Sequence, residues 1–208
     1  MLRYILMADI IHSGEQPPVR LMDKFKAVVE FANKKYLASI QSPLTITLGD
    51  EFQSIVNSLN GAVDLIIGLE EEIVNQNAGF KLRYVLNQGL VETEINTDTA
   101  HGMLGKGLTE ARKMLNQQKK KGERFFVSLQ NEELGLKANQ LFSLYQHFVD
   151  GWYAKDIETA SAFINGKKYT EVAKEQGKDE SSLWRKEKSM AIKEYNTCKA
   201  LIREIIRE

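Results

Sequence analysis

The chain has 208 residues, 43% of them hydrophobic, and its 28 basic residues balance its 28 acidic residues. This length suits one main domain with a small appended module, and the hydrophobic content is sufficient for a buried core. The charge balance excludes a global field that would draw the protein to nucleic acid or anionic lipid, so any such binding must be local.

The cysteine content and the apolar runs indicate the compartment. Cys198 is the sole cysteine, so it cannot form an internal disulfide, which is typical of proteins in a reducing environment. The N-terminus lacks the ordered features of a secretory signal. No apolar run approaches the roughly 20 residues that cross a bilayer. We therefore expect a cytoplasmic protein that does not insert into a membrane.

The first 130 residues alternate between strand-like and helix-like patterns. A buried strand is predicted up to Asp9, followed by a loop from Ser13 to Pro18 and an amphipathic helix from Arg20 to Ile40. The elements predicted next are a hairpin of Leu44–Leu48 and Phe52–Val56, a helix over Val63–Val74, a strand pair of Leu82–Leu86 and Leu90–Ile95, a loop containing Gly102, Gly105 and Gly107, a helix over Leu108–Lys121 capped by Gly122, and a strand over Phe125–Leu129. This order, with a mostly antiparallel sheet and helices on one face, predicts an α+β ferredoxin-like domain over residues 1–130.

From about residue 131 the patterns predict helices only. Residues 131–155 form an apolar connecting helix, and residues 156–208 form a small all-α module. Within that module two helices flank a tight turn at Gly177, with Leu183 and Trp184 as buried contacts, which is the pattern of a helix-turn-helix. A helical hairpin that contacts protein rather than DNA is an equally good interpretation.

Two aspartates suggest a metal site. Asp9 closes the first strand, and Asp50 follows Gly49 at the predicted hairpin turn. If the two strands are neighbours, both carboxylates lie at one sheet end, where hard oxygen ligands suit Mg²⁺ or Mn²⁺. Turn formation by Asp50 and helix capping by Asp9 are the simpler alternatives.

The order of these motifs resembles a known domain. Asp9-Ile10, the hairpin Leu48-Gly49-Asp50, and then the segments LRYVLNQGLVETEI, MLGKGLTEARKML and FFVSL follow the order of the class III nucleotidyl cyclase domain. The combination of MADIIHS, LGDEFQS and a trailing helix-turn-helix resembles the SatD family more particularly. The resemblance implies that Asp9 and Asp50 bind metal ions, that the protein is a homodimer, and that nucleotide is a ligand.

Other positions depart from active cyclases. Ile46 stands where the resemblance expects a base-selecting lysine, and Gly102 where it expects an aspartate. In active cyclases an asparagine orients the ribose and an arginine stabilises the transition state. The resemblance aligns these two residues with Thr109 and Lys113, and Arg112 lies one place out of register. Because lysine lacks the bidentate fork of arginine, an efficient cyclase is not expected.

The remaining candidates are positions that can contact phosphate or DNA. His12 and Ser13 follow the first strand closely enough to reach a phosphate at its end. The candidate nucleotide-binding residues are Ile10, His12, Ser13, Gly49, Thr109, Arg112 and Lys113. The candidate DNA-binding residues, at the start of the second helix of the pair, are Ser181, Ser182, Arg185, Lys186 and Lys188.

These patterns predict a regulatory protein in which a metal–nucleotide-binding domain is coupled to a DNA-binding helix pair. A slow or divergent nucleotide-processing enzyme, and an interaction module without a ligand, are the alternatives.

Overall fold

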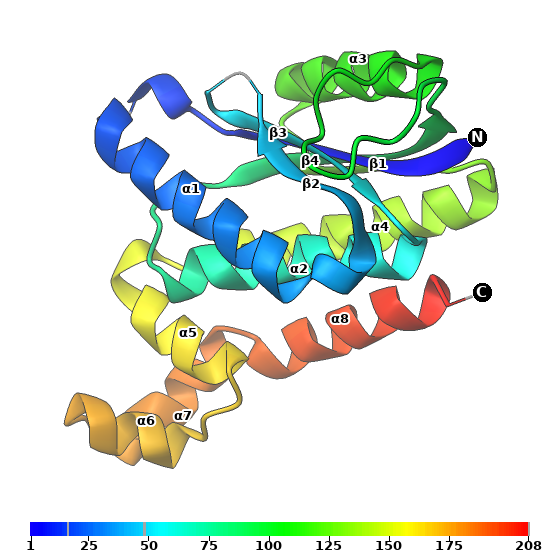
Figure 1. Cartoon of the computed structure of the whole chain (residues 1–208). Coiled ribbons are helices and arrows are strands. Elements are labelled where there is room, and N and C mark those ends of the chain that lie inside the picture. Colours follow the sequence, from blue (N-terminus) through cyan, green and yellow to red (C-terminus); the bar gives the residue numbers. More distant parts are fainter. Residues whose placement is uncertain (16, 48, 208) are drawn as a thin grey trace.

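The computed structural model describes residues 1–15, 17–47 and 49–207; Leu48, at the end of a predicted strand, lies outside the described residues. Within these ranges the chain forms one five-stranded sheet and eight α-helices (Figure 1). The strands are β1 (Leu2–Ile10), β2 (Ile40–Ile46), β3 (Glu51–Val56), β4 (Leu82–Leu90) and β5 (Phe125–Ser128). The helices are α1 (Pro18–Lys35), α2 (Leu59–Asn75), α3 (Lys106–Lys121), α4 (Glu132–Asp150), α5 (Ile157–Ile164), α6 (Tyr169–Gln176), α7 (Glu180–Ser189) and α8 (Ile192–Ile205).

The sheet has the strand order β2-β3-β1-β4-β5, and only the β4–β5 pair is parallel. The four antiparallel strands follow the order of a ferredoxin-like βαββαβ unit. From Ile5 to Ile10 every residue of β1 is buried, because β1 is central and both faces of the sheet are covered. The prediction of an α+β chain is therefore confirmed.

The structure corrects the predicted strand pair after α2. One continuous strand, β4, runs from Leu82 to Leu90 and pairs with the whole of β1. Gly89 does not form a turn, because its backbone stays extended opposite Arg3. The residues after Leu90 form an irregular loop that ends at Gly105.

Helices cover both faces of the sheet, and not the one face that was predicted. Helices α1, α2 and α4 lie on one side, and α3 lies alone on the other (Figure 1). The alternation of β1 divides its side chains between these layers. Leu6 and Ala8 join the larger hydrophobic cluster, whereas Ile5 and Met7 pack with the apolar stripe of α3.

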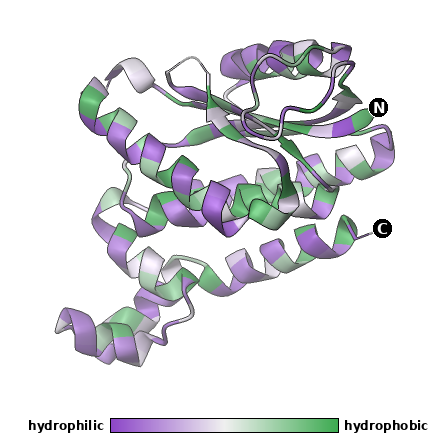
Figure 2. Ribbon diagram, viewed as in Figure 1, coloured by the Kyte–Doolittle hydropathy of each residue, from purple (hydrophilic) through white to green (hydrophobic). Residues whose placement is uncertain are grey.

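The C-terminal helices share the larger cluster. Helix α8 packs on α4 and α2, and Tyr195 and Ile202 are fully buried there. The cluster thus extends across the proposed boundaries at residues 130 and 155, which stay predictions. Helices α6 and α7 exist with Gly177 in a left-handed turn, as predicted, and they form a mainly hydrophilic tip (Figure 2). Trp184 is 47% exposed, so its prediction as a buried contact is wrong.

Among the described residues, every helix is too short or too polar to cross a bilayer.

Candidate functional site

The ends of three strands place a row of charged residues beneath α3. In the sheet register Asp9 lies opposite Glu51 on one side and Arg83 on the other. Alternation along β1 puts Asp9 on the same face as Met7, which packs under α3. Asp9 is 1% exposed and Glu51 is 6% exposed.

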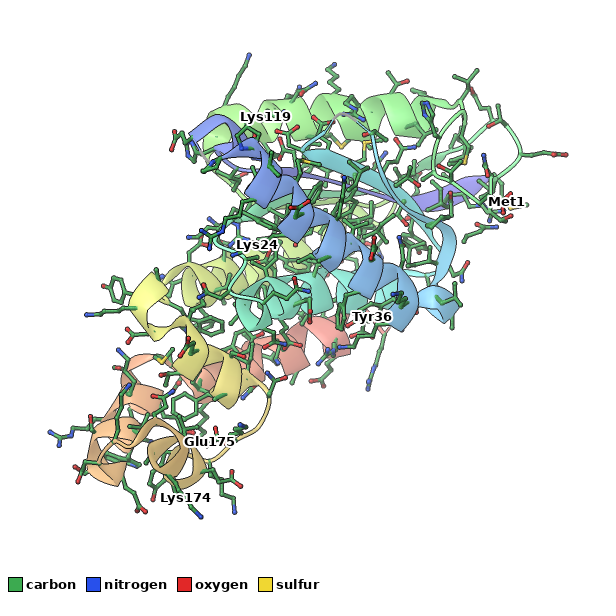
Figure 3. All side chains as sticks on the ribbon, turned by 60° about the vertical axis from the view of Figure 1, so that its left-hand side comes forward. Met1, Lys24, Tyr36, Lys119, Lys174 and Glu175 are labelled. Carbon is green, nitrogen blue, oxygen red and sulfur yellow. The ribbon has the colours of Figure 1, made fainter. Side chains whose placement is uncertain are left out.

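The Asp9 carboxylate is held by two cationic side chains. Nη1 of Arg83 donates to Oδ1 and Oδ2 of Asp9 at 2.9 and 3.0 Å. Nζ of Lys119 lies 2.9 Å from Oδ2 of Asp9 and 3.4 Å from Oε1 of Glu51. Figure 3 places Lys119 on α3, above the connection between β1 and α1. Arg112, two helical turns earlier, forms an ion pair with Glu51.

This cluster carries three positive and two negative charges. Burial lowers the pKa of the Arg112 guanidinium, and the nearby Asp9 carboxylate acts in the opposite direction. Because both acids are desolvated, removal of one cationic partner would leave a buried charge with less compensation. We name Asp9, Glu51, Arg83, Arg112 and Lys119 the α3 charge cluster.

Asp50 has a different environment, although the chain brings it to the same sheet end. Its backbone carbonyl accepts a hydrogen bond of 2.9 Å from the Ile10 amide. Its carboxylate accepts a bond of 2.5 Å from the Ser13 hydroxyl. The predicted proximity of the two segments is therefore observed, but Asp9 is ion-paired whereas Asp50 binds a hydroxyl.

The residues in this arrangement do not fit a divalent ion at Asp9. Both oxygens of Asp9 are occupied by Arg83 and Lys119, whose positive charges would repel a metal ion at contact distance. Within the described part of the chain, no three Asp, Glu, His or Cys side chains gather as a metal site would require. Binding of Mg²⁺ or Mn²⁺ by Asp9 and Asp50 stays a prediction, and it requires the cations to release Asp9.

The predicted phosphate-binding residues at the sheet end have unequal access to ligand. The Ile10 side chain is buried in the larger cluster, so only its backbone belongs to this site. His12 is exposed and lies 3.2 Å from Glu15. Gly49 has a φ of 81°, which glycine adopts without strain at the turn before Asp50.

The other predicted nucleotide contacts lie on α3. Thr109, Arg112 and Lys113 line a shallow groove of about 390 Å³. Its remaining residues include Lys120, so three of its side chains are cationic. Arg112 joins this groove to the sheet end through its ion pair with Glu51. The structure thus divides the predicted nucleotide site into two parts linked by the α3 charge cluster.

Some of the predicted DNA-binding residues of α7 already form hydrogen bonds or ion pairs within the chain. The Ser181 hydroxyl and the Ser182 amide donate to Asp179, the N-cap residue. Lys186 forms a 2.5 Å ion pair with Asp156. Arg185 and Lys188 are exposed and lie three residues apart, on one face of the helix.

Sequence reasoning missed Glu51, Arg83 and Lys119. Glu51 follows Asp50 directly, and the register of β3 with β1 places it opposite Asp9. Arg83 carried a usable signal, since a charged residue inside the apolar strand LRYVL needs a buried partner. Lys119 carried no such signal, because it stands in a run of three lysines at a helix end.

The fold and the site define an α+β protein with an ion-paired carboxylate cluster at one sheet end. The model of the SatD family matches residues 4–206, and the chain belongs to this family. A search of curated proteins found no match.

Several solved structures to which the chain is similar are nucleotide cyclases. A bacterial light-regulated adenylyl cyclase is 11% identical, with a TM-score of 0.41, over 61% of this chain and 43% of that one. The catalytic core of a rhodopsin-guanylyl cyclase with converted specificity, in complex with ATPαS, is 14% identical, with a TM-score of 0.36, over 55% and 71%. The guanylate cyclase domain of RhGC from Catenaria anguillulae, in complex with GTP, is 12% identical, with a TM-score of 0.33, over 55% and 72%.

Proposed function

We propose that this SatD-family protein is a regulator that binds a phosphate-bearing ligand of the nucleotide class without efficient turnover. The observation that carries the proposal is the neutralisation of Asp9 by Arg83 and Lys119. Two-metal catalysis needs carboxylates that are free to hold the ions, and Asp9 is already occupied by cations of its own chain.

The charges next to Asp9 support an anionic ligand. The α3 charge cluster has one positive charge in excess, and the groove beside it adds Lys113 and Lys120. Guanidinium and ammonium groups bind phosphate oxygens through charge-assisted hydrogen bonds. The Ser13 hydroxyl extends the polar surface at the sheet end.

Thermal denaturation with ATP or GTP in the presence of EDTA tests the proposal. We expect each effective nucleotide to raise the melting temperature without metal, because only the folded state binds it. The double variant Lys113→Ala and Lys120→Ala should lose at least half of the shift. Lys155→Ala with Lys193→Ala removes two lysines outside the groove and should keep it. Absence of a shift with both nucleotides would contradict the proposal.

The alternative of a slow metal-dependent enzyme stays open to a direct assay. Incubation of the pure protein with nucleotides and Mn²⁺, followed by chromatography, should give no product above the rate of an Asp9→Asn plus Asp50→Asn variant. A metal-dependent rise in melting temperature that this variant abolishes would favour the predicted Mg²⁺ or Mn²⁺ site.

We propose DNA binding by α6 and α7 as a second function. Its support is the helix pair around Gly177, with the exposed side chains of Arg185 and Lys188 on one face. Occupation of Lys186 by Asp156 limits the contacts available to this helix. Gel retardation of the neighbouring promoter tests it, and Arg185→Ala with Lys188→Ala should abolish retardation. No retardation of any promoter fragment by the unaltered protein would favour a protein-contact role for the pair.

We also propose that the protein forms a homodimer, as the family resemblance implies. Light scattering during size-exclusion chromatography tests this proposal, because the measured mass of a dimer would be twice the chain mass of 23.7 kDa.

A further inference from the structure

A second cavity lies on the face of the sheet opposite α3. It has a volume of about 350 Å³ and is bounded by α2, the segments that precede β4 and β5, the end of α4 and the start of α5. This volume falls in the range of small-molecule sites, roughly 300 to 1,000 Å³. We name it the α2–α5 cavity.

Apolar side chains form most of its wall. They include Ile73, Val74, Phe80, Val149, Trp152 and Ile157. Apolar walls with few polar groups are the usual lining of sites that bind small molecules. The Trp152 indole N–H donates to the Met190 carbonyl at 3.1 Å, so the ring is fixed in the wall.

A buried ion pair supplies the polar part of the wall. Arg124 and Glu70 are 3% and 5% exposed, and Nη2 of Arg124 donates to Oε2 of Glu70 at 2.6 Å. A buried ion pair adds little stability over apolar residues of the same volume, so its place in a cavity wall points to recognition.

The Arg124 guanidinium has more N–H donors than the hydrogen bonds that it makes among the described residues. Its Nε donates to the Leu82 carbonyl, Nη1 to Asp150 and Nη2 to Glu70, which uses three of the five N–H groups of an arginine. The charges around it are balanced, because Lys81 also pairs with Asp150 at 2.8 Å. The carboxylates of Glu70 and Asp150 would repel an anionic ligand, whereas they would not repel a neutral acceptor.

We propose that the α2–α5 cavity binds a small, uncharged, mostly apolar molecule that carries one hydrogen-bond acceptor, such as a carbonyl oxygen. The acceptor receives an N–H of Arg124, and the apolar body packs against Trp152, Val74 and Ile73. Because His12 also lines the cavity and precedes Ser13, the same loop joins this ligand to the sheet end.

Acetophenone and isopropylbenzene test the proposal as a matched pair, since their heavy atoms have the same number and connectivity and only the first has an acceptor. The chain has two tryptophans, and Trp184→Phe assigns their indole signals in a ¹H–¹⁵N NMR spectrum. We expect acetophenone to shift the Trp152 signal saturably, to leave the Trp184 signal in place, and to bind at least threefold more tightly than isopropylbenzene.

Two variants at exposed neighbouring positions locate the binding. Ala154 lines the mouth of the cavity and Lys155 does not, so Ala154→Phe should abolish the shift whereas Lys155→Phe should keep it. Equal melting temperatures establish that both variants fold. Absence of a Trp152 shift, equal binding of the two probes, or an unchanged shift in Ala154→Phe would each overturn the proposal.

Discussion

The ammonium group of Lys119 lies 2.9 Å from Oδ2 of Asp9 and 3.4 Å from Oε1 of Glu51. One side chain of α3 therefore bridges carboxylates of two neighbouring strands, β1 and β3. A divalent ion next to Asp9 was the prediction from the sequence, and both oxygens of that carboxylate contact cationic side chains instead. The chain supplies its own cation there, and that cation also joins helix to sheet.

Lys119→Met should lower the free energy of unfolding by about 1–2 kcal/mol. A broken buried pair costs more than this, but Lys119 is 42% exposed and solvent screens part of its charge. Urea denaturation measures the change. Lys120→Met removes the next lysine, which lies on the groove, and should change the value by less than about 0.5 kcal/mol. Equal losses of unfolding free energy in the two variants would show that Lys119 does not stabilise the protein by bridging Asp9 and Glu51.

Asp9→Asn and Asp50→Asn should differ in stability. At Asp9 the change removes the carboxylate that Arg83 and Lys119 share, which costs about 2–4 kcal/mol by the behaviour of broken buried pairs. At Asp50 the amide oxygen can still accept from Ser13, so we expect a loss below about 1 kcal/mol. The midpoints of urea unfolding compare the stabilities of the two variants. A larger loss of stability in Asp50→Asn than in Asp9→Asn would contradict the observed pairing.

The sequence predicted features that depend on local patterns. Gly122 caps α3 in a left-handed conformation, as expected from a glycine behind a basic helix end. The patterns could not show which strand lies beside which, and this determines the site. Arg83 and Glu51 reach Asp9 only because β1 lies between β3 and β4. The place of α3 on the second face is likewise a property of the assembled sheet.

Arg124→Met should destabilise the protein by about 3–5 kcal/mol. Burial acts to lower the pKa of Arg124, but the carboxylates of Glu70 and Asp150 outweigh it and raise the pKa. Without the guanidinium, Glu70 becomes a buried charge whose remaining donor, within the ranges that the structure describes, is the Tyr84 hydroxyl. Lys81→Met removes the half-exposed cation next to Asp150 and should cost less than about 1 kcal/mol. Comparable losses would show that burial of Arg124 has no energetic consequence.

Stability should fall as the pH rises above about 10. Burial raises the pKa values of Tyr84, Tyr145 and Tyr195, with further contributions from nearby groups, while unfolded tyrosines ionise near the ordinary value of 10.0. A raised pKa in the folded state favours the neutral form there, so this stability is present below pH 10 and is lost at higher pH. Melting temperatures between pH 8 and 11 measure the loss. Absorbance at 295 nm should show that these tyrosines resist ionisation in the folded protein, and ionisation near pH 10 would contradict their burial.

Gly107→Ala should displace α3 from the sheet. The loop prediction for Gly107 is wrong, because this residue lies in the first turn of α3 and packs against Gly89 of β4. A Cβ at Gly107 would lie 2.5 Å from the backbone carbon of Gly89, and backbone cannot move aside as a side chain can. We expect a loss of about 2–4 kcal/mol in urea denaturation, of the size that overpacking and backbone shifts produce.

Gly135→Ala is the matched control, since its Cβ would make ordinary contacts from 3.6 Å. The helical propensity of alanine should leave that variant unchanged or up to about 1 kcal/mol more stable. If Gly107→Ala were as stable as Gly135→Ala, the close approach of α3 to β4, and with it the position of Lys119 over Asp9, would be wrong.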